Sequence, residues 1–179
     1  MYKNILIVIG FVFPVMNAAA GPASLCRKNE TIYFSCATNS GKIISLCGDA
    51  FYQDEFGSLT EIDNPWLQYR FGSPGKIELS YPPQKNDSLK RFASDKIRAL
   101  RGEIRLDAVF FANAGIAYSV EHVVPDTGEI FEGVHVGAAQ DFGIETAGKR
   151  RKQYPRAAIE CKESANVENF FSLVDFLAK

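Results

Sequence analysis

The chain has 179 residues, of which 46% are hydrophobic, and a net charge of −1 at pH 7. This length is enough for one domain with a single core. The near-neutral charge argues against a nucleic-acid-binding protein, because such proteins usually carry an excess of basic residues. The sequence contains no internal repeat and no low-complexity segment.

The first 20 residues have the layout of a secretory signal peptide. Lys3 precedes an apolar run over residues 5–16, and three alanines end at Ala20, after which we place the cut. The apolar run is shorter than the roughly 20 residues of a spanning helix, so we expect no membrane span. We predict a signal peptide over residues 1–20 and one mature domain over residues 21–179, periplasmic or secreted.

The runs TIYFSC and KIISLC, which flank ATNSG, predict the first β-hairpin. It pairs Phe34 and Ile32 with Ile44 and Leu46. The segment that follows, GDAFYQDEFGSLTEIDNP (48–65), reads as a long acidic and aromatic loop, and long loops often carry function. From this loop we select the candidate binding residues Phe51, Tyr52, Asp54 and Glu55.

All four cysteines follow the predicted leader, and an even number in an exported chain indicates two disulfides. Three connectivities are possible. The hairpin register sends Cys36 and Cys47 to opposite faces, which disfavours a bond between them. Cys26 and Cys47 lie at the same open end of the hairpin, so we predict Cys26–Cys47 and, by elimination, Cys36–Cys161.

The stretch WLQYRFGSPGKIELSYP (66–82) predicts a second hairpin around the three-residue loop Ser73–Gly75. Its apolar pairs, all on one face, are Phe71 with Ile77, Tyr69 with Leu79, and Leu67 with Tyr81. The other face pairs Arg70 with Glu78, and an exposed charge pair of this kind is worth about 0.2–1 kcal/mol. We interpret Arg70 as a solvated sheet residue rather than a ligand-binding one.

The middle of the chain predicts a short helix and then further strands. Asp87 is placed to cap a helix that carries Leu89, Phe92 and Ala93. The run EIRLDAVFFA then predicts a strand with Ile104, Leu106, Ala108 and Phe110 on one face.

A third hairpin is predicted by AYSVEHVVPDTGEIFEGVHVG (117–137), with the loop Asp126–Gly128. The predicted pairs are Val124 with Ile130, Val120 with Val134, and Tyr118 with Val136. His122 then falls opposite Glu132, while His135 faces the other side of the sheet, so the two histidines cannot share a metal ion. A structural role for His122 is favoured over a general base.

The run AAIECK predicts the last strand, and SANVENFFSLVDFLAK predicts an amphipathic C-terminal helix over residues 166–178. Asn166 is its expected cap, and Val167, Phe170, Phe171, Val174 and Leu177 share its apolar face. The acidic opposite face does not suit an anionic membrane surface. We expect the helix to pack on the sheet, with partner binding as the alternative.

Catalytic signatures are missing from the sequence. It has no G-x-S-x-G, H-E-x-x-H or phosphate-binding glycine loop, and no CxxC spacing or histidine cluster. We therefore expect no cofactor, no metal and no catalytic residue, which favours a role other than catalysis. The acidic residues Asp54, Glu55, Glu61 and Asp63 support one alternative, a hydrolase that places two carboxylates across a cleft and raises the pKa of one.

The order FSC…GKIISLC…WLQYRFGSPGKIELSYP…IECK resembles a group of small exported bacterial proteins, largely uncharacterised, with cysteine-bounded hairpins and a YLQYRFG ribbon. The likeness covers residues 26–82 well. It implies a Gram-negative periplasmic or surface β-protein and transfers no activity.

A second, weaker resemblance is to the periplasmic and membrane-bound inhibitors of C-type lysozyme, which are small disulfide-bonded β-barrels. Their Ser-Gly-x-x-Tyr loop enters the lysozyme cleft and corresponds here to Ala114–Tyr118. Alanine replaces the serine and removes a hydrogen-bonding hydroxyl. The resemblance therefore rests on Gly115 and Tyr118, and it adds Asn113, Gly115 and Tyr118 to the candidate binding residues.

Together these patterns predict a mainly β domain, an antiparallel barrel or sandwich with two disulfides and a C-terminal helix. The leading functional hypothesis is a non-catalytic exported binding protein of the bacterial envelope, an inhibitor or immunity-type module. Its partner would be another protein, such as a lysozyme-like or toxin enzyme, and not a nucleic acid. The alternatives are a carboxylate-dependent hydrolase of cell-wall or glycan material and a structural envelope component.

Overall fold

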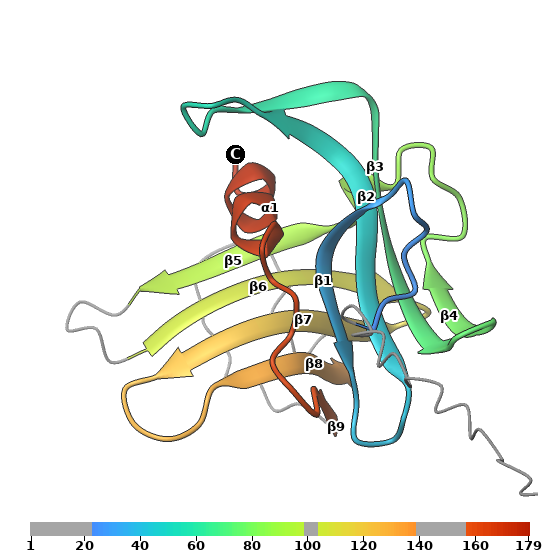
Figure 1. Cartoon of the computed structure of the whole chain (residues 1–179), viewed down its shortest axis with the longest axis vertical. Coiled ribbons are helices and arrows are strands. Elements are labelled where there is room, and N and C mark those ends of the chain that lie inside the picture. The colour runs from blue at the N-terminus through green and yellow to red at the C-terminus, as the bar shows by residue number, and fades with distance from the viewer. Residues whose placement is uncertain (1–22, 99–103, 139–156) are drawn as a thin grey trace, which may run out of the picture.

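The structure is a computed structural model that describes residues 23–98, 104–138 and 157–179 (Figure 1). The predicted signal peptide lies outside the described residues. The elements are β1 (Thr31–Ala37), β2 (Ile43–Gln53), β3 (Leu59–Ser73), β4 (Lys76–Tyr81), the 3-10 turn η1 (Leu89–Arg91), β5 (Ala93–Arg98), β6 (Ile104–Asn113), β7 (Ile116–Pro125), β8 (Phe131–Ala138), β9 (Ala157–Glu160) and α1 (Phe170–Leu177). No helix in these ranges is long and apolar enough to cross a membrane.

The described strands form two antiparallel sheets. The first has the order β1-β2-β3-β4 and the second the order β5-β6-β7-β8-β9, so within each sheet the strands pair in chain order. In Figure 1 the strands of the two sheets cross, with α1 beside them. The predicted mainly β, antiparallel domain is confirmed, and two sheets that share one core have the arrangement of a sandwich rather than of a closed barrel.

Aromatic side chains join the two sheets across the core. Phe111 on β6 stacks on Tyr118 of β7, with ring centroids 4.9 Å apart, and on Tyr81 of β4 at 4.7 Å. Tyr69 on β3 lies 5.1 Å from Phe111, and burial raises the pKa of its hydroxyl. Aromatic pairs contribute about 0.5–1.5 kcal/mol beyond their buried area, so this cluster stabilises the contact between the sheets.

The first two hairpins differ from their predicted registers. In the first, Phe34 lies opposite Leu46 rather than Ile44, and a bulge between Ile32 and Phe34 places Ile32 opposite Cys47. The shift of two residues keeps Phe34 on its predicted face, because side chains alternate along a strand.

In the second hairpin, Ser73 pairs with Lys76, so the loop is the two-residue Pro74-Gly75 turn rather than the predicted three residues. Gly75 has φ +78°, which suits the second central position of a turn with proline at the first. A bulge at Phe71 and Gly72 then brings Tyr69 opposite Tyr81, so the three predicted apolar pairs are wrong. The alternation of faces is retained because this shift is also of two residues.

The third predicted hairpin, which is formed by β7 and β8 of the second sheet, has the predicted register. Val120 lies opposite Val134, Tyr118 opposite Val136 and His122 opposite Glu132, as predicted. On β6, however, Val109 and Phe111 enter the core, and these residues lie on the face opposite to the predicted one. The predicted helix after Asp87 is only the 3-10 turn η1, and Ala93 begins β5 instead.

Both predicted disulfides are present. Cys26 is bonded to Cys47 and Cys36 to Cys161, with Cα atoms 5.4 Å and 5.6 Å apart. The second bond links β1 of one sheet to the residue after β9 of the other. Backbone bridges between Thr38 and Cys161 and between Ser35 and Asn166 lie beside it, so the chain returns from the second sheet to the first at this point.

The C-terminal helix packs on the core as predicted, although it is shorter than residues 166–178. It begins at Phe170, and Asn166 is not its cap because its backbone bonds to Ser35 instead. Phe170, Leu173 and Val174 are fully buried, whereas Phe171, predicted for the apolar face, is exposed.

We expect removal of Cys36–Cys161 to destabilise the protein more than removal of Cys26–Cys47. The bonded residues are 125 and 21 positions apart, and the loop-closure model gives about 5 and about 3 kcal/mol respectively. Denaturant unfolding of the double variants Cys36→Ala/Cys161→Ala and Cys26→Ala/Cys47→Ala would measure the difference. An equal loss in both variants would contradict this ranking.

Candidate functional site

The segment over residues 48–65, predicted as a loop, is mostly a hairpin, so that prediction is wrong for all but its tip. We call residues 51–63 the β2–β3 arm. Within it Phe51 lies opposite Glu61, Tyr52 opposite Thr60 and Gln53 opposite Leu59. Figure 1 shows the arm projecting past the end of α1. Pairing satisfies the backbone hydrogen bonds of residues that a loop would leave to water.

The tip of the arm is closed by Asp54. Its Oδ1 accepts hydrogen bonds from the backbone N–H groups of Phe56 (2.9 Å) and Ser58 (2.8 Å). Gly57 adopts φ +83°, a conformation that glycine reaches without strain. Asp54 was predicted as a binding residue, and the structure uses its carboxylate to hold the turn in shape.

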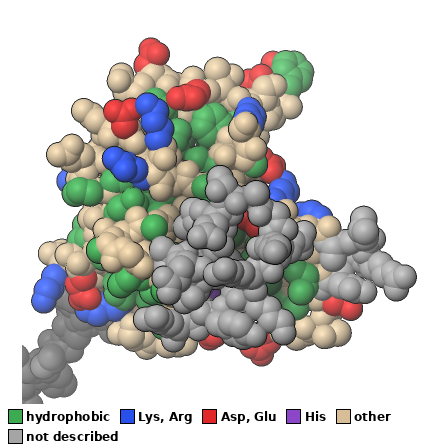
Figure 2. All heavy atoms as spheres, turned by 180° about the vertical axis from the view of Figure 1, so that it is seen from behind, with side chains coloured by type: hydrophobic (Ala, Val, Ile, Leu, Met, Phe, Trp, Pro, Cys, Tyr) green, Lys and Arg blue, Asp and Glu red, His purple; other side chains and the backbone are tan. Residues whose placement is uncertain are grey.

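The arm exposes two large aromatic side chains. Tyr52 is 64% exposed and Phe56 is 85% exposed. Figure 2 shows hydrophobic and acidic atoms side by side at the upper right, where the arm of Figure 1 projects. Phe56 is not among the predicted binding residues, although an aromatic residue beside a turn glycine is a signal that the sequence contains.

The other side of the arm is fixed to the body of the domain. Phe51 lies 5.0 Å from Phe176 and 5.7 Å from Tyr33, measured between ring centroids. Ser172 donates a hydrogen bond to Gln53 (3.2 Å). Phe51, a predicted binding residue, therefore packs inward, and Tyr52 beside it points outward because side chains alternate along the strand.

The arm carries charge of one sign. Its acidic residues are Asp54, Glu55, Glu61 and Asp63, and no lysine or arginine occurs between residues 51 and 63. Glu55, Glu61 and Asp63 are exposed. The arm therefore combines exposed aromatic surface with negative charge.

The second predicted surface is the turn between β6 and β7. Gly115 is exposed in this turn with φ +78°. Tyr118 is half-buried and stacks on Phe111 in the core cluster, and its ring lies 6.0 Å from that of Tyr69. Asn113 ends β6 and is also half-buried. The structure thus gives Tyr118 a packing role, and the exposed part of this turn is the chain from Ala114 to Ile116.

Arg70 is not a solvated sheet residue, so that prediction is wrong. The residue is 3% exposed, and its side chain does not contact Glu78, which pairs with Lys42 instead. Arg70 donates to both carboxylate oxygens of Glu30, at 2.5 and 3.0 Å. The partner lies 40 residues away, before β1, and no local pattern signals it.

Further hydrogen bonds complete the buried network around Arg70. Its Nε donates to Gln68 (2.9 Å), and its Nη1 also donates to the backbone oxygen of Leu25 (2.9 Å). Lys85 reaches Glu30 Oε1 at 3.1 Å. Such a network is stable only when every buried polar group has a partner, and no buried side-chain nitrogen or oxygen among the described residues lacks one.

This network lowers the pKa of Glu30. Burial alone would raise it, but hydrogen bonds from the Arg70 guanidinium, the Arg27 backbone N–H and the Lys85 ammonium outweigh burial and lower the pKa from 4.5 to about 2. Glu30 is therefore ionised throughout the physiological range, and its charge serves to hold Arg70.

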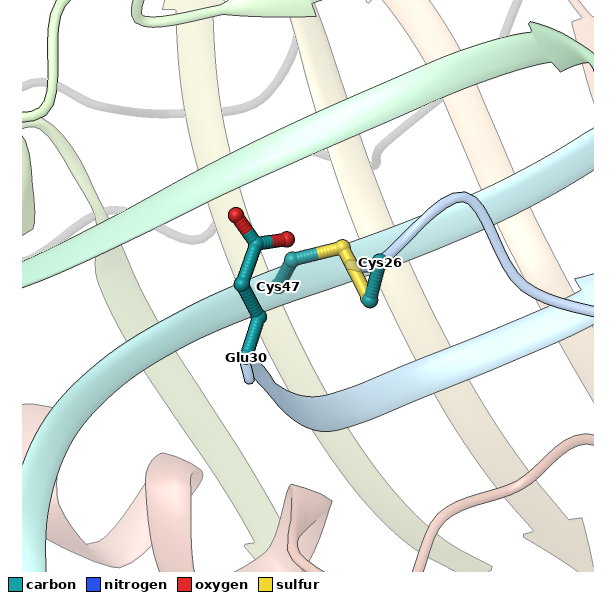
Figure 3. A group of neighbouring side chains, drawn as sticks. All are labelled: Cys26, Glu30 and Cys47. Atoms are coloured by element: carbon teal, nitrogen blue, oxygen red, sulfur yellow. A yellow bond between two sulfur atoms is a disulfide. The ribbon is translucent and has the colours of Figure 1, made fainter. Parts of the chain in front are cut away.

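Cys26, Glu30 and Cys47 come together in Figure 3, with ligand-type atoms within 4.8 Å of one another. The two sulfur atoms are bonded to each other, so neither offers a thiolate to a metal ion. The Glu30 carboxylate is committed to Arg70. This cluster is structural, and it fastens the chain before β1 to the first sheet.

Of the four carboxylates considered for a hydrolase, Asp54 holds its turn, and Glu55, Glu61 and Asp63 are exposed. Glu61 lines a cleft together with Asp87, where the Lys90 ammonium lowers the pKa of the Asp87 carboxyl group. A general acid needs the opposite shift. The histidines are also separate: His122 bonds to Glu132 (2.9 Å), and His135 bonds to Glu121 (2.8 Å) on the other face of the sheet.

Comparisons with protein families, with curated proteins and with solved structures each find no match to this chain.

We expect Glu30→Gln to lower the free energy of unfolding by about 3–5 kcal/mol, because it leaves the buried Arg70 without a counter-charge. Since the Glu30 pKa is lowered on folding, its contribution is present above pH 4.5 and falls, by about 3 kcal/mol, as the pH drops towards 2. Denaturant unfolding across this pH range would measure both effects.

The matched control is Glu78→Gln, which breaks the partly exposed pair with Lys42 and should change stability by no more than about 1 kcal/mol. Equal effects of the two substitutions would show that the Glu30–Arg70 pair is not the stabilising element described above.

Proposed function

We propose that this protein is a non-catalytic binding protein of the bacterial envelope, an inhibitor or immunity-type module that holds a basic partner protein with its β2–β3 arm. The observation that carries the proposal is the exposure of Tyr52 and Phe56 on an arm that bears only acidic charges. Aromatic side chains are enriched among the residues that dominate binding energy at protein interfaces.

The rigidity of the arm supports this use. Hydrogen bonds across the strands, the Asp54 turn and the contact between Phe51 and Phe176 hold the exposed aromatic residues before any partner arrives. A preorganised surface loses less conformational entropy on binding than a loop does. The side chains of Tyr52 and Phe56 can therefore contribute most of their contact energy to affinity.

The charge of the arm supports a basic partner. Exposed carboxylates at Glu55, Glu61 and Asp63 would speed the encounter with a positively charged enzyme and would lie at the rim of the contact. Two disulfides fit a protein that folds in an oxidising compartment such as the periplasm. A C-type lysozyme is the first partner to test, because it is a basic enzyme that acts on the cell wall.

The experiment is calorimetric titration of the oxidised protein with a C-type lysozyme, with lysis followed in parallel. We expect binding that suppresses lysis, and we expect Tyr52→Ser/Phe56→Ser to weaken it by at least about 30-fold, since interface hot spots contribute about 2 kcal/mol or more. Raising the salt concentration should slow association, because the acidic rim is screened.

Ile77→Ser is the matched control, because Ile77 on β4 is a similarly exposed apolar side chain (48%) outside the arm. It should leave the affinity unchanged. If the enzyme binds with equal affinity to the Tyr52/Phe56 variant, the arm is not the binding surface. If the enzyme does not bind at all, a C-type lysozyme is not the partner.

A further inference from the structure

We infer that the protein has a second binding site, separate from the exposed tip of the arm, that takes an uncharged carbohydrate. The site is a cleft of about 550 Å³ between β3, at the base of the arm, and the segment that joins β4 to β5. Clefts that bind small molecules commonly have volumes of about 300–1,000 Å³, so the size is appropriate.

The lining of the cleft is amphipathic. Trp66, Pro65 and Leu89 supply apolar surface, while Asn64 and Asn86 supply amide groups that both donate and accept hydrogen bonds. A pyranose ring has the complementary character, because its C–H groups form apolar faces and its hydroxyls project around the rim. Aromatic and amide side chains together therefore match a sugar better than a purely apolar ligand.

The charges that line the cleft balance, because Lys85 and Lys90 stand against Glu61 and Asp87. Lys90 contacts Asp87 at 2.6 Å, and Lys85 also contacts the buried Glu30 at 3.1 Å. Figure 2 shows acidic and basic side chains interspersed at the upper left, on the side of the segment after β4. An anionic ligand would have to compete with these carboxylates and a cationic ligand with the ammonium groups. An uncharged ligand meets neither obstacle.

Lys85 also fixes the aromatic residue of the site. Its Nζ lies 3.4 Å from the centroid of the Trp66 ring, a cation–π contact that holds the indole in one orientation. Because Lys85 is itself held by Glu30, the cleft is tied to the buried Arg70 network. The backbone also adopts positive φ at two residues of the lining, Asn64 (+55°) and Asp87 (+54°), and left-handed residues of this kind cluster at ligand sites.

The single tryptophan of the chain is Trp66, so tryptophan emission reports on this cleft alone. The test is titration of the oxidised protein with cellohexaose, chitohexaose and maltohexaose, followed by emission and by calorimetry, with hexagalacturonate as an anionic probe. We expect at least one uncharged oligosaccharide to bind saturably with Kd below about 1 mM, and the anionic probe to bind at least tenfold more weakly.

Asn86→Ala should weaken that binding by about tenfold, the usual effect of losing one hydrogen-bonding side chain. The matched control is Asn39→Ala in the exposed turn after β1, which should leave it unchanged. The inference is overturned if all three uncharged probes give flat emission and calorimetric titrations, if the anionic probe binds more tightly than they do, or if Asn86→Ala binds as the parent does.

Discussion

The disulfide between Cys36 and Cys161 is the constraint on which the rest of the architecture depends. Each sheet is a meander built from neighbouring strands, so the chain itself joins the two sheets at few places. The bond and the adjacent backbone bridges bring the end of β9 onto β1. From there the chain leads directly into α1, whose buried side chains close one side of the core and whose Phe176 supports the β2–β3 arm. The disulfide thus fastens the segment that leads into α1, and α1 in turn supports the arm through the contact of Phe176 with Phe51.

The buried polar network around Arg70 stabilises the other side of the first sheet. The Glu30–Arg70 pair, the Cys26–Cys47 disulfide and Lys85 fasten the segments before β1 and after β4 to the sheet. A buried ion pair is weak evidence for stability by itself, but removing one partner is costly because the other charge stays buried. The main effect of the Glu30–Arg70 pair is to fix the positions of the segments before β1 and after β4 on the sheet. Lys85 connects this network to Trp66, so the same interactions that anchor the segment before β1 also shape the proposed carbohydrate cleft.

Local patterns predicted the hairpins β1–β2, β3–β4 and β7–β8 and the register of the last of them, because alternation is a property of neighbouring residues. The open end of the first hairpin predicted Cys26–Cys47, and Cys36–Cys161 then followed by elimination. The first two registers were wrong, by two residues at Phe34 and at Tyr69, since bulges and the Pro74-Gly75 turn add shifts that leave these side chains on their predicted faces. The arm was read as a loop because acidic residues are uncommon in strands. Arg70 was misread because its partner lies 40 residues earlier in the chain, and Phe56 was overlooked because exposure depends on how the tip projects. Contacts between residues far apart in the chain, rather than strand propensity, determine the features that the sequence did not predict.

We propose that the rigid acidic arm binds the partner and that the turn between β6 and β7 serves mainly in packing. Amide hydrogen exchange of the free protein and of its complex with a C-type lysozyme tests this assignment most directly, because it maps the contact without altering any residue. We expect new protection over residues 52–61 and little change over residues 113–118. Protection confined to residues 113–118, or no change at the arm on binding, would contradict this assignment.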